Sequence, residues 1–275
     1  MATNSGIEWT EATWNPTSGC SKISPGCKNC YAETMTKRLL AMGQQKYNKG
    51  FKYVEHPSDV SLPASWKKSK KIFVNSMSDL FHEKSTFEFT GRCFATMIRA
   101  DWHDYQILTK RPKRMAEFSK LFVKYFAHKI PNYIWMGTSI ESSEYVSRIN
   151  DLQKVRCHTR FISFEPLLES VGRVNLRGID WVIIGGESGH HYRPVQKEWI
   201  EDIINQCTRQ EVAVFFKQWG GPRPKSGGRT INGKKYDQYP KIKRRNSLKD
   251  VHFDESAFAE MCLVHESQKR ILLAK

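Results

Sequence analysis

Short apolar runs alternate with longer segments of helical periodicity along most of this 275-residue chain. The runs are rich in β-branched and aromatic residues, which favour strands. The predicted strands are Lys71–Ser76, Tyr105–Thr109, Tyr133–Ser139, Thr159–Phe164, Asp180–Gly185 and Val212–Lys217, with an earlier strand expected within Glu11–Ser18. The predicted helices are Cys30–Met42, Thr86–Ala100, Pro112–Ala127, Ser142–Val155 and Lys197–Arg209. This alternation predicts an α/β protein.

Several predicted strands are apolar on both faces, as in YIWMG and WVIIGG, which indicates a parallel sheet covered by helices. Periodicity alone leaves a doubly wound sheet and a barrel both open. Polar residues follow nearly every strand, at the ends that form the active-site face of parallel α/β folds. This distribution favours a partial or full (β/α) barrel of the TIM type with six or seven parallel strands.

The composition changes after Gly221. Residues 222–250 hold ten Lys or Arg against two Asp. Asn232-Gly233 between short extended runs predicts a type I′ hairpin, and Asp254 is expected to cap a last helix that runs through Leu272. We therefore divide the chain into a barrel, residues 1–221, and a basic C-terminal extension, residues 222–275.

The whole chain has 44 Lys and Arg against 28 Asp and Glu, a formal net charge of +16. Such a surplus is typical of proteins that bind nucleic acid, with a generally basic enzyme as the alternative. No apolar run is long enough to cross a membrane, and the N-terminus lacks the pattern of a secretory signal. We therefore expect a cytoplasmic protein with reduced cysteines.

Three of the seven cysteines, Cys20, Cys27 and Cys30, have the spacing C-x6-C-x2-C. Two thiols would suit a redox pair, and four would complete a tetrahedral zinc site. Three thiolates on one loop, residues 19–31, suit a [4Fe–4S] cluster whose fourth iron stays open for a small molecule. A zinc site with a fourth ligand from elsewhere is the alternative.

The segment from Ile7 to Arg38 and the later runs NSMSDLF, ILTKRPKRM, GTSIES, FISFEPLLE, VIIGGESG and FFKQWGG resemble the three-cysteine-motif family of bacterial and phage proteins, whose function is largely unknown. That family is similar to radical SAM enzymes, which hold a [4Fe–4S] cluster after the first strand of a partial or full barrel. The resemblance implies that the open iron binds S-adenosylmethionine (SAM), which one electron cleaves to a 5′-deoxyadenosyl radical.

Two features depart from the common radical SAM pattern. The usual spacing is C-x3-C-x2-C with an aromatic residue before the last cysteine, whereas here the first gap is six residues and Tyr31 follows Cys30. The Gly-Gly-Glu signature of those enzymes follows their second strand, whereas GGES (185–188) follows the sixth predicted strand. We therefore carry no cofactor role from that signature onto Glu187.

Position at the strand ends suggests the cofactor contacts. Asn75 and Ser76 would lie nearest the methionine part of SAM, and Thr138 and Ser139 nearest its ribose.

Two charged residues at strand ends are candidate catalytic groups. Glu165 would point into the barrel mouth, where it could bind substrate, contact the cofactor ribose or carry a proton. Lys110, like Arg111 after it, could hold a phosphate or the SAM carboxylate. A solvated strand end and a basic helix start are the respective alternatives.

Two groups of residues are candidates for nucleic-acid binding. Lys217 and Trp219 combine a cation for phosphate with a ring for base stacking, although Trp219 could equally close the barrel floor. The candidates in the basic extension are Lys241, Lys243, Arg244 and Arg245, beside Tyr236 and Tyr239.

Together with the resemblance to radical SAM enzymes, these patterns predict an iron–sulfur enzyme of that kind that repairs or modifies a nucleotide or nucleic acid. A flavodoxin- or ferredoxin-like electron donor is implied. The alternative is a non-catalytic nucleic-acid-binding protein with a structural zinc or iron–sulfur site.

Overall fold

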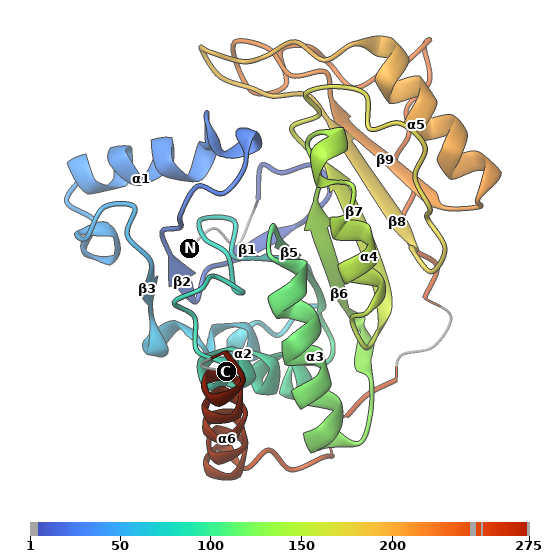
Figure 1. The fold of residues 1–275 in the computed structure, drawn as a ribbon. Coiled ribbons are helices and arrows are strands. Elements are labelled where there is room, and N and C mark those ends of the chain that lie inside the picture. Colours follow the sequence, from blue (N-terminus) through green and yellow to red (C-terminus); the bar gives the residue numbers. More distant parts are fainter. Residues whose placement is uncertain (1–4, 243–245, 249, 274–275) are drawn as a thin grey trace.

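The computed structural model describes residues 5–242, 246–248 and 250–273. Its centre is a sheet of seven parallel strands in sequence order, curled into a half-barrel (Figure 1). The strands are β1 Ala12–Trp14, β4 Lys71–Val74, β5 Asp104–Thr109, β6 Ile130–Ser139, β7 Cys157–Phe164, β8 Trp181–Gly185 and β9 Ala213–Gln218. Every predicted strand is present, and the predicted partial barrel of the TIM type is confirmed.

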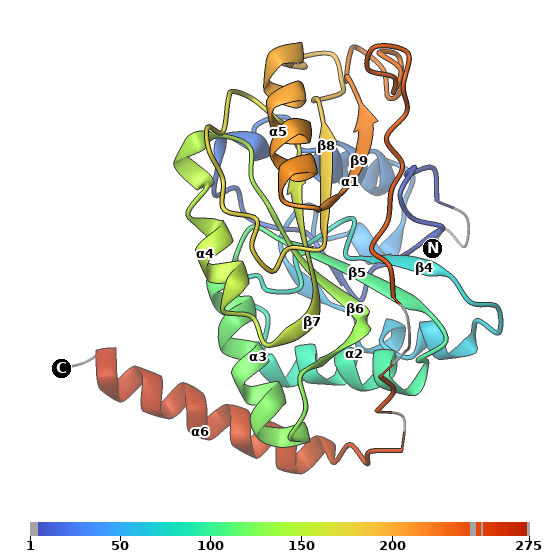
Figure 2. The same ribbon diagram turned by 90° about the vertical axis from the view of Figure 1, so that its right-hand side faces the viewer.

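Four helices follow strands and cover the outer side of the curved sheet: α2 Phe87–Arg99, α3 Pro112–Phe126, α4 Arg148–Gln153 and α5 Lys197–Arg209 (Figures 1 and 2). Helix α1 Tyr31–Ala41 follows the cysteines and lies apart from the sheet, and α6 Glu255–Leu273 lies near α2 (Figure 1). None of the helices in the described ranges is long and apolar enough to span a membrane.

The predicted helix Ser142–Val155 is wrong in its first half. A 3-10 turn occupies Ser143–Tyr145, and the α-helix begins at Arg148. The N–H and the hydroxyl of Ser143 both donate to Oε1 of Glu169, at 2.9 and 2.6 Å. A short polar side chain bonded in this way competes with helix formation.

Both faces of the sheet are apolar because each contributes to a separate core. In β8, Val182 and Ile184 belong to the large core between the sheet and the helices. Trp181 and Ile183 face the other way, into the half-barrel. There they join an inner cluster, which consists of Trp9, Trp135, Phe161, Trp181, Ile183 and Phe215. The filled interior leaves the strand ends as the places where polar groups gather.

The basic extension runs from the carboxyl end of β9, where the carbonyl of Thr230 accepts from the indole of Trp219, to the amino ends of the strands. The N–H of Phe216 donates to the carbonyl of Tyr236 (2.8 Å), so the segment runs along the free edge of β9. The Tyr239 ring stacks on Trp181, the first residue of β8, at a centroid distance of 5.3 Å. Tyr236 and Tyr239 are therefore packed against the barrel.

Helix α6 docks on α2 and α3 through Phe258, which is buried. A Cβ atom built on Gly91 of α2 would lie 2.2 Å from Cε1 of Phe258. Glycine is unfavourable inside a helix by about 1 kcal/mol relative to alanine, so the close approach of the ring explains its presence here.

Gly91→Ala should therefore destabilise the protein by about 1–3 kcal/mol, because the added methyl group displaces the Phe258 ring. Chemical denaturation would measure the loss, and hydrogen exchange would localise it to α6. In a Phe258→Ala background the same change should be neutral or stabilising. A loss of equal size in both backgrounds would contradict this explanation.

Candidate functional site

The cysteine loop, residues 19–31, lies at the carboxyl ends of the strands. After β1 the chain forms β2 Thr17–Ser18, which pairs antiparallel with β3 Val54–Glu55, and then enters the loop. The loop forms hydrogen bonds with Arg111, Glu141 and Glu187, which follow β5, β6 and β8. Residues far apart in the sequence thus meet around the three cysteines.

Cys20 is fixed by a tight turn before it. Gly19 has φ +74°, and a Cβ atom there would lie 2.1 Å from the carbonyl oxygen of Lys52. The N–H of Cys20 then donates to the carbonyl of Phe51 at 3.0 Å. Only glycine permits this approach without displacing the neighbouring backbone.

Arg111 connects Cys20 to the strand ends. Its Nη1 donates to Oδ2 of Asp79 at 2.9 Å and to Sγ of Cys20 at 3.8 Å, and its Nε donates to Oε1 of Glu83 at 2.5 Å. Asp79 also accepts a hydrogen bond from the Thr109 hydroxyl at 2.7 Å. A guanidinium with its donors in a fixed planar arrangement suits such a multiply bonded position.

The environment of Cys20 and Cys30 favours the protonated thiol before any metal binds. Burial raises the pKa of Cys20 to about 12, and the charge of Asp79 acts in the same direction, while Arg111 opposes it. Burial also raises the pKa of Cys30. Because the thiolate is the metal ligand, metal binding here should release protons.

Cys27 lies beside a buried carboxylate. The N–H of Gly26 donates to Oε1 of Glu141 at 3.4 Å, and the side chain of Glu141 is completely buried. Its Oε2 accepts from Lys110 at 3.0 Å and from Arg148 at 2.9 Å. Burial acts to raise the pKa of Glu141, but Lys110 and Arg148 together hold it below its ordinary value.

A second buried carboxylate holds the loop near Cys30. Glu187 accepts from the Asn29 amide at 3.0 Å and from Nε of Arg193 at 2.8 Å, and Nη2 of Arg193 donates to the carbonyl of Pro25 at 3.1 Å. Gly186, just before Glu187, permits a close backbone contact, since a Cβ atom there would lie 2.0 Å from the carbonyl oxygen of Trp219.

Glu165, predicted as a catalytic residue, and Lys217, predicted to bind nucleic acid, form an ion pair at the barrel mouth. The amino group of Lys217 donates to Oε1 of Glu165 at 2.6 Å, and both side chains are mostly buried. The indole N–H of Trp219 donates to the carbonyl of Thr230 at 2.8 Å, and its ring packs against Phe216.

The four predicted cofactor contacts differ in how their polar groups are used. The hydroxyl of Thr138 donates to the carbonyl of Thr109 at 2.9 Å, inside the sheet. Ser139 accepts at its carbonyl from Arg148, and the Ser76 hydroxyl donates to the side chain of Asn15. Asn75 is buried and has φ +63°. Its Nδ2 has no hydrogen-bond partner among the described residues.

The chemistry of the donor set fits a [4Fe–4S] cluster. The three thiols are partly exposed, and Cys27 and Cys30 lie close enough to interact electrostatically with each other. In the described ranges, no three His, Cys, Asp or Glu side chains form a group that could hold a metal ion. In a [4Fe–4S] cluster each thiolate binds a different iron, so the sulfur atoms do not need to meet at one point.

The part of the basic extension that holds the predicted nucleic-acid-binding residues approaches the barrel far from the cysteines. Tyr239 contacts the amino ends of the strands, and Lys241, two residues later, is exposed. Lys243, Arg244 and Arg245 lie outside the described residues. Lys241 therefore follows a segment at the opposite end of the sheet from the cysteine loop.

Several residues that hold the loop were not assigned a role from the sequence. They are Asp79, Glu141, Arg148, Glu187 and Arg193. Arg111 was predicted as a ligand for a phosphate or the SAM carboxylate, and in the structure it bonds to Asp79, Glu83 and Cys20 instead. One usable signal was present: Asp79, Arg111, Glu141 and Glu187 all follow apolar strands within five residues. Which cation pairs with which carboxylate depends on the curvature of the sheet, and no spacing in the sequence encodes it.

The carboxylates at the barrel mouth should make the stability of the protein sensitive to acidic pH. Their interactions with the neighbouring cations lower the pKa values of Glu141 and Glu187, and that of Glu83 to about 2, although burial opposes all three shifts. Each carboxylate therefore stabilises the fold above its unfolded-state pKa near 4.5, and this contribution is lost as the pH falls through the folded value. The free energy of unfolding should decrease as the pH falls from about 5 towards 2.

Glu141→Gln should lower stability at neutral pH by roughly 3–5 kcal/mol, because Lys110 and Arg148 lose their buried partner. The substitution should also make the free energy of unfolding depend less on pH. Glu260→Gln, on the exposed side of α6, is the matched control and should change neither quantity appreciably. Urea titrations across this pH range measure both, and an unchanged pH profile for Glu141→Gln would contradict the assignment.

Comparison with known proteins gives one result. Residues 4–240 match the model of a family described as a protein of unknown function, DUF5131. No curated protein and no solved structure matches the chain significantly. The match covers the half-barrel, the cysteine loop and the predicted hairpin, so this chain belongs to the DUF5131 family.

Proposed function

We propose that this protein is a radical SAM-like iron–sulfur enzyme that acts on a nucleotide or nucleic acid. The observation that carries the proposal is the placement of the three thiols. Cys20, Cys27 and Cys30 stand on one loop at the carboxyl ends of a partial parallel barrel, tied to residues after three of its strands. This is the face on which parallel barrels carry their active sites.

The residues of the barrel mouth would have different roles. Cys20, Cys27 and Cys30 would hold the cluster, which when bound supplies an open iron for SAM and the electron that cleaves it. The unpaired amide of Asn75 would donate to the carboxylate of SAM. Arg111 donates towards Sγ of Cys20, and hydrogen bonds to the sulfur atoms are among the factors that set the reduction potential of a cluster.

Two ion pairs at the mouth would contact the substrate. Lys110 is held by Glu141, and Lys217 by Glu165. Each pair offers a cation for phosphate, and the Glu165 carboxylate could also accept or return a proton, whereas the fully buried Glu141 only holds Lys110 in place. The net charge of +16 supports a phosphate-bearing substrate and an acidic electron donor of the flavodoxin or ferredoxin type. This chemistry is compatible with either repair or modification of the substrate.

The cluster is tested by the metal content. Protein reconstituted without oxygen should be brown and contain about four irons per chain, as expected for a [4Fe–4S] site. Replacing Cys20, Cys27 or Cys30 with Ala should abolish the absorption. Cys93→Ala, at a buried cysteine of α2, is the matched control and should keep it. Colourless protein with one tightly bound zinc would favour the non-catalytic binding protein instead.

The products formed from SAM test whether the protein cleaves this cofactor reductively. Reduction of the reconstituted protein by dithionite in the presence of SAM should release 5′-deoxyadenosine and methionine, measured by chromatography. Asn75→Ala should raise the SAM concentration needed for half-maximal cleavage while leaving the iron content unchanged. An intact cluster that never cleaves SAM, with or without oligonucleotide, would contradict an enzymatic role.

A further inference from the structure

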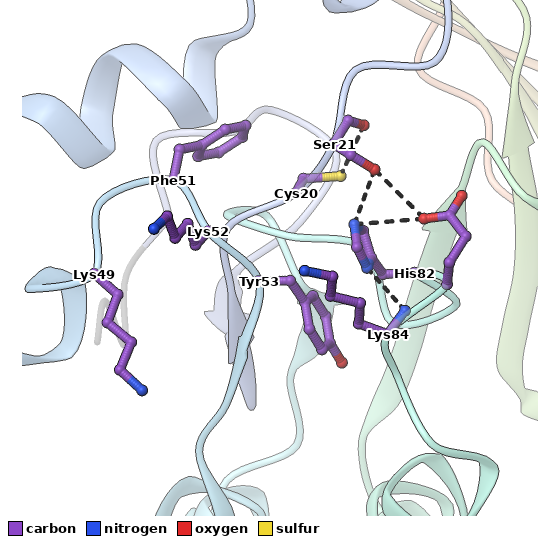
Figure 3. Close-up of a pocket in the computed structure, with 9 residues that line it drawn as sticks. Cys20, Ser21, Lys49, Phe51, Lys52, Tyr53, His82 and Lys84 are labelled. Carbon is purple, nitrogen blue, oxygen red and sulfur yellow. Dashed lines mark hydrogen bonds and ion pairs between the residues drawn. The ribbon is translucent and has the colours of Figure 1, made fainter.

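A groove of about 480 Å³ lies beside Cys20, on the side of the cysteine loop that faces β3. Cys20 lies between two walls, with residues of segment 49–53 on one side and residues of segment 82–84 on the other (Figure 3). We call it the lysine groove, lined by Lys49, Phe51, Lys52, Tyr53, His82 and Lys84. A cavity of this size is within the range of small-ligand sites.

The groove carries uncompensated positive charge. Lys49, Lys52 and Lys84 are exposed, and none of them forms an ion pair with a residue in the part of the chain that the structure describes. The one carboxylate of the lining, Glu83, is already bonded to Nε of Arg111 at 2.5 Å. Three free ammonium groups around one depression attract an anion.

The groove also has aromatic walls. The Tyr53 ring stacks on His82 with a centroid distance of 4.5 Å and an interplanar angle of 5°. Nδ1 of His82 accepts from the N–H of Lys84 at 3.1 Å, so the ring is fixed from both sides. Phe51 is only half-buried and contributes a third ring to the lining.

The groove is joined directly to the candidate cluster ligand. The carbonyl of Phe51 accepts from the N–H of Cys20 at 3.0 Å, and the hydroxyl of Ser21 is bonded to Nε2 of His82 at 2.9 Å. A ligand that filled the groove would therefore contact the residues on both sides of the Cys20 thiol.

We propose that the lysine groove binds the phosphate backbone of single-stranded nucleic acid, with Phe51 stacking on a base. Cations that follow a backbone together with an aromatic ring are the features that recognise single strands. A groove of this size admits one or two nucleotides and is too small for the broad surface that a folded protein partner presents. The binding itself is independent of the enzymatic proposal. Only the further step, delivery of a nucleotide to the cluster, rests on it.

The experiment measures binding of a short fluorescein-labelled single-stranded DNA or RNA to the full-length, cluster-reconstituted protein by fluorescence anisotropy. Changing Lys49, Lys52 and Lys84 together to Glu should weaken binding by more than about tenfold and reduce the salt slope by about 2, at roughly 0.7 per lost phosphate contact. The matched control reverses Lys67, Lys68 and Lys120, which are equally exposed, and should cause a much smaller loss. The cluster absorption and the melting temperature of each variant verify that it is folded.

A second pair of variants tests the stacking. Phe51→Ala should weaken binding roughly tenfold, whereas Phe51→Trp should retain it. Competition by unlabelled oligonucleotide but not by a nucleoside monophosphate would identify a strand as the ligand. Equal competition by the monophosphate would show that free nucleotide is bound and overturn the strand proposal.

The outcomes separate this inference from the enzymatic one. If oligonucleotide binding is unchanged when the three lysines of the groove are replaced by Glu, the proposal for the lysine groove is wrong, even if the wild-type protein cleaves SAM. Groove-dependent binding by a protein that never cleaves SAM supports the groove and contradicts the enzyme. If reversal spares oligonucleotide binding but blocks cluster reduction by flavodoxin, the groove is a docking surface for an acidic protein and the proposal is wrong.

Discussion

Buried ion pairs hold the cysteine loop to the mouth of the half-barrel. Glu141 is fully buried, yet it accepts hydrogen bonds from Lys110, Arg148 and the backbone of Gly26. A buried carboxylate is tolerated only when such partners compensate its lost hydration. Because the loop has little apolar surface of its own, its position depends on these polar contacts.

The same arrangement separates the two ends of the molecule. The interior of the sheet is filled by aromatic rings such as Trp135 and Phe161, and Tyr239 of the basic extension packs at the amino ends of the strands. Polar chemistry is thereby confined to the carboxyl ends. The lysine groove extends this polar region outward between residues 49–53 and 82–84, next to Cys20.

Much of the fold could be read from the sequence because strands buried on both faces have an unmistakable composition. All seven were located, and the partial barrel follows from their number and from the polar residues after them. The helix expected from Ser142 was too long because Ser143 bonds to Glu169, which is distant in the sequence. The thiol spacing likewise identified the cysteine loop, since three thiols in eleven residues have few uses.

The sequence by itself determined the alternation of elements, the family and the position of the three cysteines along the chain, because these depend on local composition and spacing. The tertiary structure alone decided that Glu187 bonds to Asn29 across the mouth, and that Lys49 and Lys84 line one groove beside Cys20. It also decided that Tyr239 packs on Trp181 at the far end of the barrel. Contacts between distant residues depend on the curvature of the sheet and the paths of its loops, which are set by packing over the whole molecule.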